Sequence, residues 1–111
     1  MSRNKAPKSY TTPFGATIFV GRDAIQNDHL VLQFKEKNPH ALWFHIQDQP
    51  GPHVILDGST KPEDIRAAAI FAARNKTCVV EYCEVSNVFK PKKASAGEVM
   101  LMEEPQRISI D

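Results

Sequence analysis

Residues 42–56 have the sequence LWFHIQDQPGPHVIL and decide the predicted fold, because turn-forming residues separate two apolar-rich stretches. Side chains alternate between apolar and polar types over residues 42–48, which is typical of a strand with one buried face. The QPGP run at residues 49–52 predicts a turn, and residues 53–56 predict a second strand. Pairing the two strands around this turn gives an antiparallel hairpin.

This hairpin has a predicted core face and a predicted outer face. The apolar residues Phe44, Ile46, Val54 and Leu56 fall on the core face, whereas Trp43, His45 and His53 fall together on the other face. We expect these three rings to be exposed to solvent. We expect the turn itself to be shaped by Asp48, Pro50 and Gly51, with Gly51 in a conformation that other residues resist.

Two helices are predicted outside the hairpin. Residues 60–75 form the main helix, with Thr60 and Glu63 as a capping box and Pro62 in the first turn. A second, short helix is predicted near residues 24–36, with Asp28 as its cap and an apolar face formed by Leu30, Val31 and Phe34.

The predicted architecture is an α+β domain, in which the main helix packs on one face of a mostly antiparallel sheet. Further strands are expected over residues 16–20, 78–86, 99–102 and 107–110. The 111 residues suffice for one core. We expect a flexible basic arm over residues 1–12 and one domain over residues 13–111.

Composition restricts the cellular environment and the partners. Cys78 and Cys83 fall on opposite faces of one predicted strand, so a disulfide between them is not expected. Free thiols and the lack of a long apolar run indicate a cytoplasmic protein, the nucleus not excluded, with no membrane partner. The net charge is only +1, so a basic surface must come from uneven distribution of charge.

The ordered motifs of the chain resemble the NFACT-R domain. Residues 21–30 (GRDAIQNDHL) are similar to its opening motif, and residues 43–56 are similar to its long Trp-Phe-His to His-Val motif. An alanine-rich helix, a V-x-Y strand and a lysine-rich loop follow in the family's order. Pro52 and Asn75 depart from the resemblance, because both replace a serine.

This resemblance implies an RNA-binding module, here as a stand-alone version. Longer proteins with this domain include ribosome quality-control factors that bind tRNA and the large ribosomal subunit. The expected partner is therefore RNA, either tRNA or ribosomal RNA, with a ribosomal or quality-control protein as a further partner. We expect no catalytic residue, metal or other cofactor.

The candidate RNA-binding residues are rings that can stack on bases and polar or basic groups that can contact phosphates. They are Arg22, Asn27, Trp43, His45, His53, Lys76, Lys90, Lys92 and Lys93. For each, a purely structural role remains open: Trp43 can pack under a loop, Asn27 and Asp28 are common turn residues, and lysine-rich loops are often only solvated.

Two other functions stay open from the sequence. The chain could be a protein-interaction module, with Met100 and Met102 on its docking surface. A metal-dependent hydrolase is the second alternative, because His45, Asp48 and His53 are metal-ligand types, although their spacing matches no tight metal motif.

Overall fold

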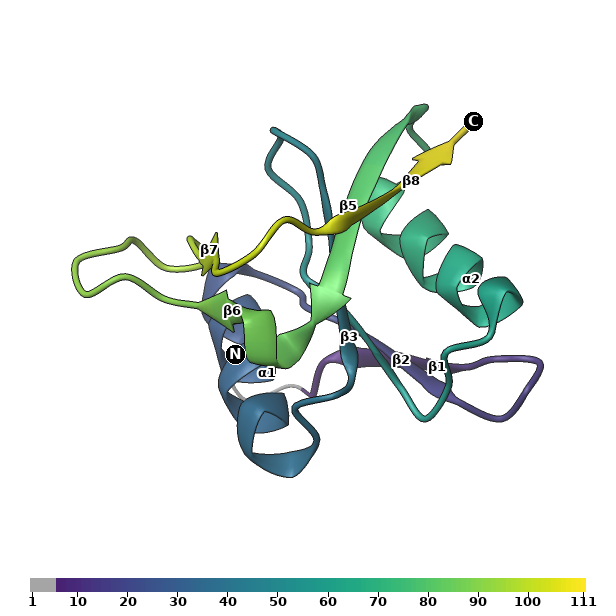
Figure 1. Cartoon of the computed structure of the whole chain (residues 1–111), viewed down its shortest axis with the longest axis horizontal. Helices are drawn as coiled ribbons and strands as arrows, with labels where there is room; N and C mark the ends of the chain where they lie inside the picture. Colours follow the sequence, from purple (N-terminus) through teal and green to yellow (C-terminus); the bar gives the residue numbers. More distant parts are fainter. Residues whose placement is uncertain (1–5) are drawn as a thin grey trace.

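The computed structural model describes residues 6–111, which form an antiparallel six-stranded sheet with one helix on each face (Figure 1). This confirms the α+β prediction. The strand order is β1-β2-β4-β3-β5-β8. The strands are β1 (Lys8–Thr11), β2 (Thr17–Val20), β3 (Leu42–Ile46), β4 (Val54–Asp57), β5 (Cys78–Glu84) and β8 (Gln106–Ile110). The helices are α1 (Ala24–Lys37) and α2 (Pro62–Ala73), and a small ribbon pairs β6 (Val88–Phe89) with β7 (Met100–Leu101) after a 3-10 turn (Val85–Asn87).

Helix α2 covers the first face of the sheet and forms the larger core. Its alanines Ala68, Ala69, Ala72 and Ala73 are at most 1% exposed, and their small side chains let the helix approach the strands closely. Pro62 opens the helix as predicted, but Lys61 is the N-cap residue and no side chain caps it. The predicted Thr60–Glu63 capping box is therefore wrong.

The β3–β4 hairpin has the predicted pairing, with Phe44 opposite Val54. Its turn differs from the prediction, because the residue with a positive φ is Asp48 at 58°, and Gly51 has none. A Cβ at Gly51 would lie 3.1 Å from Cγ2 of Ile46, so the Ile46 side chain would have to shift by a few tenths of an ångström to accept one.

Helix α1 covers the second face of the sheet at the predicted position. It begins at Ala24, and the carboxylate of Asp23 accepts the backbone N–H of Gln26 at 2.8 Å. The cap is therefore Asp23, and the predictions that Asp28 caps the helix or lies in a turn are wrong. The apolar periodicity predicts that a helix forms, but it does not show which residue caps its N-terminus.

Asn27 and Gly21 fix α1 against the sheet. The side-chain oxygen of Asn27 accepts the backbone N–H of His53 at 3.1 Å, and the backbone N–H of Gly21 donates to the carbonyl of His53 at 3.0 Å. A Cβ on Gly21 would lie only 1.8 Å from that Asn27 oxygen. Only glycine therefore allows helix α1, the end of β2 and the start of β4 to meet.

The N-terminal part of the chain differs from the predicted flexible arm over residues 1–12. Lys8–Thr11 form the edge strand β1, in which Tyr10 pairs with Ile18 of β2. Residues 1–5 lie outside the described residues. Over residues 6–111, no helix is long and apolar enough to cross a membrane.

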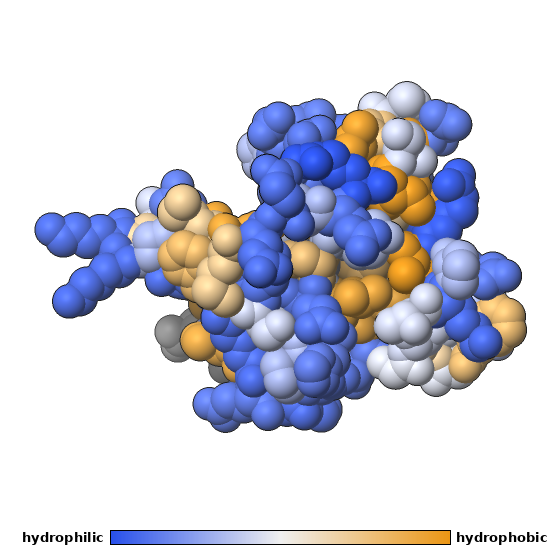
Figure 2. Space-filling view, viewed as in Figure 1, coloured by the Kyte–Doolittle hydropathy of each residue, from blue (hydrophilic) through white to orange (hydrophobic). Residues whose placement is uncertain are grey.

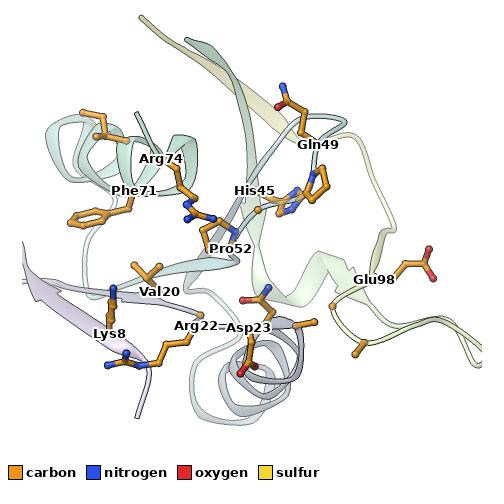
Figure 3. Close-up of a pocket in the computed structure, with 18 of the residues that line it drawn as sticks. Lys8, Val20, Arg22, Asp23, His45, Gln49, Pro52, Phe71, Arg74 and Glu98 are labelled. Atoms are coloured by element: carbon orange, nitrogen blue, oxygen red, sulfur yellow. The ribbon is translucent and has the colours of Figure 1, made fainter. Parts of the chain in front are cut away.

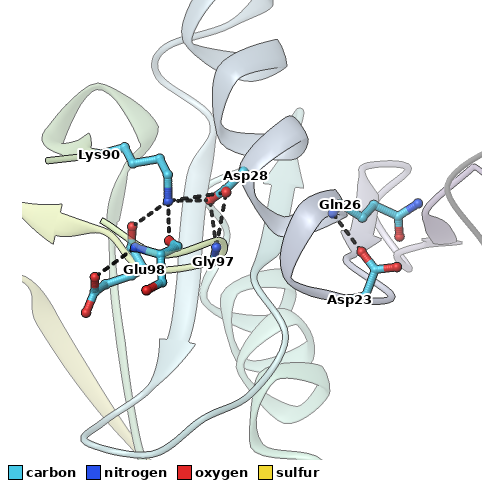
Figure 4. A network of polar contacts seen from close by, with 7 residues as sticks. Asp23, Gln26, Asp28, Lys90, Gly97 and Glu98 are labelled. Atoms are coloured by element: carbon cyan, nitrogen blue, oxygen red, sulfur yellow. Dashed lines mark hydrogen bonds and ion pairs between the residues drawn. The ribbon is translucent and has the colours of Figure 1, made fainter. Parts of the chain in front are cut away.

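Asp28 attaches the β6–β7 loop to α1 (Figure 4). Its carboxylate accepts the backbone N–H of Gly97 at 3.1 Å and forms an ion pair with Lys90 at 3.3 Å. The Lys90 ammonium also donates to the carbonyls of Ser95 and Glu98. Asp28 and Lys90 together therefore hold the loop that connects β6 to β7 through its backbone at Ser95, Gly97 and Glu98.

Replacing Asn27 by alanine should destabilise the fold, because the buried backbone N–H of His53 then loses its hydrogen-bond acceptor, the side-chain oxygen of Asn27. We expect the free energy of unfolding to fall by about 1 to 3 kcal/mol. Urea unfolding followed by circular dichroism measures this change. Gln33→Ala, on an exposed position of the same helix, is the control and should change stability by less than about 0.5 kcal/mol.

Asp28→Ala should loosen the β6–β7 loop without unfolding the domain, since the Gly97 amide and the Lys90 ammonium both lose an acceptor. Amide hydrogen exchange at Gly97 should accelerate at least about tenfold. The exposed helix residue Glu36, changed to alanine, provides the matched control. Unchanged exchange at Gly97 would show that the carboxylate does not hold the loop.

Candidate nucleic-acid interface

The rings of Trp43, His45 and His53 lie together, as predicted, but they do not form a solvent-exposed platform. Trp43 and His53 are only 3% and 2% exposed, because α1 and the segment around Val88 cover this face. The Trp43 ring stacks on His45 with centroids 5.8 Å apart, and the His53 ring lies edge-on to both at 5.3 Å. Two of the three predicted stacking rings are thus unavailable to a base.

Burial also keeps the two histidines neutral near pH 7. Desolvation by burial is the main cause that lowers the pKa of His53 to about 4, and electrostatic repulsion from His45 is the second cause. Desolvation likewise lowers the pKa of His45, partly offset by a hydrogen bond with the backbone of Gly51. Neither ring therefore supplies a positive charge to a phosphate.

The other predicted contact residues divide into engaged and exposed groups. Asn27 is buried against His53, and Lys90 is held by Asp28 and the loop carbonyls, so both serve the fold. Lys92 and Lys93 are exposed on the β6–β7 loop, whose hydrophilic side chains project on the left of Figure 2. Lys76 is exposed, with its ammonium 3.5 Å from the Gln49 side chain.

A groove of about 1270 Å³ lies on the surface of the described residues (Figure 3). Five parts of the chain line it: the edge strand β1, the C-terminal end of α2, the junction of β2 with α1, the β3–β4 turn and the β6–β7 loop. Arg22, Asn27 and His45 are the predicted RNA-binding residues that line it, and Pro50 and Gly51 form part of its wall. The β6–β7 loop closes one side with Gly97 and Glu98.

Three cationic side chains line this groove from three separate elements: Lys8, Arg22 and Arg74. Arg22 uses Nε to donate to the carbonyl of Ala6 at 2.9 Å. Within residues 6–111, the side chains of Lys8 and Arg74 make no hydrogen bond or ion pair, and Figure 3 shows the Arg74 side chain extending toward Pro52. These cations are therefore available to an anionic ligand.

Two acids also line the groove. The Asp23 carboxylate is engaged by the first turn of α1, and the Glu98 carboxylate accepts the backbone N–H of Ser95 at 3.1 Å. Figure 3 shows Glu98 on the side away from Lys8. The wall formed by β1 and α2 is accordingly the cationic one.

Arg74 adopts a backbone conformation that usually belongs to glycine. It follows the last residue of α2 with φ 53° and ψ 51°, the left-handed position where helices commonly place glycine. A residue with a Cβ costs on the order of 1 kcal/mol there. The strained conformation directs a guanidinium into the groove, which makes Arg74 a candidate functional residue.

The sequence prediction missed Lys8, Tyr10, Phe71 and Arg74, all of which line the groove. Lys8 and Tyr10 fall in the predicted flexible arm, because the polar sequence KSYT of β1 carries no apolar alternation. Arg74 lies at the end of the predicted main helix, where no sequence pattern distinguishes it from the neighbouring Lys76.

The metal-dependent hydrolase, the second alternative from the sequence, would need a set of metal ligands, and the described part of the chain has none. No group of three or more His, Cys, Asp or Glu side chains among residues 6–111 could hold a metal ion, so His45, Asp48 and His53 do not form such a group.

The domain should lose stability as the pH falls below about 6.5, because His53 binds a proton more readily when unfolded than when folded. Its folded pKa is about 4, so the loss extends from the unfolded value of 6.5 down to 4 and reaches about 3 kcal/mol. Urea unfolding at several pH values tests this. His53→Gln should flatten that part of the profile, and an unchanged slope would contradict the buried neutral ring.

The chain is similar to several known proteins. No family model matches the chain. The chain is 32% identical over 108 residues to the Rqc2 homolog RqcH of Streptococcus pneumoniae serotype 2, covering 89% of this chain and 19% of that protein. It is 32% identical over 103 residues to the Rqc2 homolog RqcH of Bacillus subtilis, covering 86% and 18%.

The solved structure of the C-terminal part of the fibronectin/fibrinogen-binding protein from Streptococcus suis has the same fold. Its TM-score is 0.86 at 29% identity, over 96% of this chain and 45% of that one. The chain thus spans about a fifth of the curated relatives it matches. It is a homologue of one segment of the RqcH proteins.

Proposed function

We propose that this chain is an RNA-binding module of the NFACT-R type that acts in translation quality control, with tRNA or ribosomal RNA as its ligand. The association with quality control follows from the RqcH relatives and from the sequence resemblance. The observation that carries RNA binding is the groove with Lys8, Arg22 and Arg74 on its walls.

The groove suits a phosphate backbone because its cations come from separate elements and converge on one open surface. Arginine pairs with phosphate through two parallel hydrogen bonds, and lysine contributes a mobile point charge. With three such contacts, the logarithm of the affinity should fall with the logarithm of salt concentration at a slope of about −2. The exposed Lys92 and Lys93 offer further contacts along the β6–β7 loop.

This surface replaces the predicted Trp-His platform. His45 is the one ring of that cluster that lines the groove, where its neutral imidazole can hydrogen-bond or stack without adding charge. Trp43 and His53 are buried, and both rings contact the ring of His45 that lines the groove.

Arg74→Gly separates binding from folding, because glycine accepts the left-handed conformation that arginine adopts with strain. Stability should stay within about 1 kcal/mol of the wild type, since relief of strain offsets the greater entropy of unfolded glycine. Affinity for fluorescein-labelled tRNA should fall about tenfold and the salt slope should decrease by about 0.7, both measured by fluorescence anisotropy.

The matched control is Arg66→Ala, which removes an exposed cation from α2 outside the groove. It should leave tRNA affinity unchanged within about twofold. Wild-type protein that binds neither tRNA nor ribosomal RNA at about 50 mM salt would reject the proposal.

A protein-docking module is the second candidate, because Met100 and Met102 are 55% and 64% exposed beside the β6–β7 loop. Flexible methionines are common at surfaces that bind proteins. If tRNA does not bind while purified large ribosomal subunits still bind the chain, and Met100→Ser with Met102→Ser abolishes that binding, this second function is the correct one.

A further inference from the structure

Tyr10 and Phe71 form an aromatic pair on the wall of the groove. Their ring centroids lie 4.3 Å apart with an interplanar angle of 26°, so the rings are stacked. Tyr10 comes from the edge strand β1 and Phe71 from the last turn of α2. Although Phe71 supports one face of its ring, Tyr10 remains 40% exposed.

Two of the groove's cations flank this aromatic pair. Lys8 precedes Tyr10 by two residues on the same strand, so the two side chains share the face of the sheet that α2 covers. Arg74 follows Phe71 by three residues and comes directly after the last residue of α2. A ring between two unpaired cations matches the repeating chemistry of an RNA chain, in which a base lies between phosphates.

We infer that Tyr10, supported by Phe71, is a stacking platform for an unpaired base, so that the groove selects single-stranded over double-stranded RNA. This inference rests on the proposed function. Bases in a duplex already stack on their neighbours and are not available to a side chain, whereas unpaired bases stack on aromatic rings irrespective of their sequence. The phosphates on either side would contact Lys8 and Arg74.

A structural role for the pair makes a different prediction. If Tyr10 only holds β1 against α2, an aliphatic side chain of similar size should serve equally well, and RNA should not distinguish the two variants. Tyr10→Leu keeps apolar packing on Phe71 and removes the aromatic face. Tyr10→Phe keeps the ring and removes only the hydroxyl.

The experiment compares a fluorescein-labelled single strand of about 12 nucleotides with the same strand annealed to its complement, by anisotropy at constant salt. We expect the wild type and Tyr10→Phe to bind the single strand at least about tenfold more tightly than the duplex. Tyr10→Leu should lose about tenfold in single-strand affinity and nothing in duplex affinity. Thermal unfolding confirms that each variant is folded.

Equal affinity for single strand and duplex, or full single-strand affinity in Tyr10→Leu, overturns the stacking platform. The proposed RNA-binding function still stands in that case if Arg74→Gly weakens binding of both probes. Loss of the preference for single strands in Tyr10→Leu, with the duplex affinity retained, supports the inference. Absence of binding to either probe by the wild type overturns the inference, and it overturns the proposed function as well if the wild type also binds neither tRNA nor ribosomal RNA.

Discussion

The contact of Asn27 with the backbone of His53 fixes the position of helix α1, and much of the remaining structure depends on it. The amide oxygen can reach the N–H of His53 only because Gly21 has no side chain, since a Cβ there would lie 1.8 Å from that oxygen. Once α1 lies in this position, it buries Trp43 and His53. It also sets Arg22 at the edge of the groove and presents Asp28 to the β6–β7 loop.

The sequence predicted the hairpin well because alternation reports on a strand directly. Phe44 pairs with Val54, and Trp43, His45 and His53 share a face, as their two-residue spacing requires. Alternation cannot say whether the opposite face meets water or another layer of the protein. The polar character of two histidines favoured water, whereas the buried stripe on α1 needed a surface to cover.

The groove could not be predicted in the same way, because it is a property of the tertiary structure. Lys8, Arg22 and Arg74 are separated in sequence and converge only when the sheet order places β1 beside β2 and α2 across the sheet. A single basic cluster would have been visible in the sequence. Net charge is a poor guide here, since a chain of charge +1 still places three cations in one groove.

The two outer strands of the sheet, β1 and β8, have a consequence for how the molecule behaves at high concentration. An outermost strand carries unpaired backbone N–H and C=O groups, with which a strand of another copy of the chain can form hydrogen bonds. On β8, Arg107 forms ion pairs with Glu81 at 3.4 Å and Glu104 at 3.2 Å, which places charge beside that edge. On β1, Lys8 has the same effect. The side chain that we assign to a phosphate would thus also help to keep the free protein from forming intermolecular sheets.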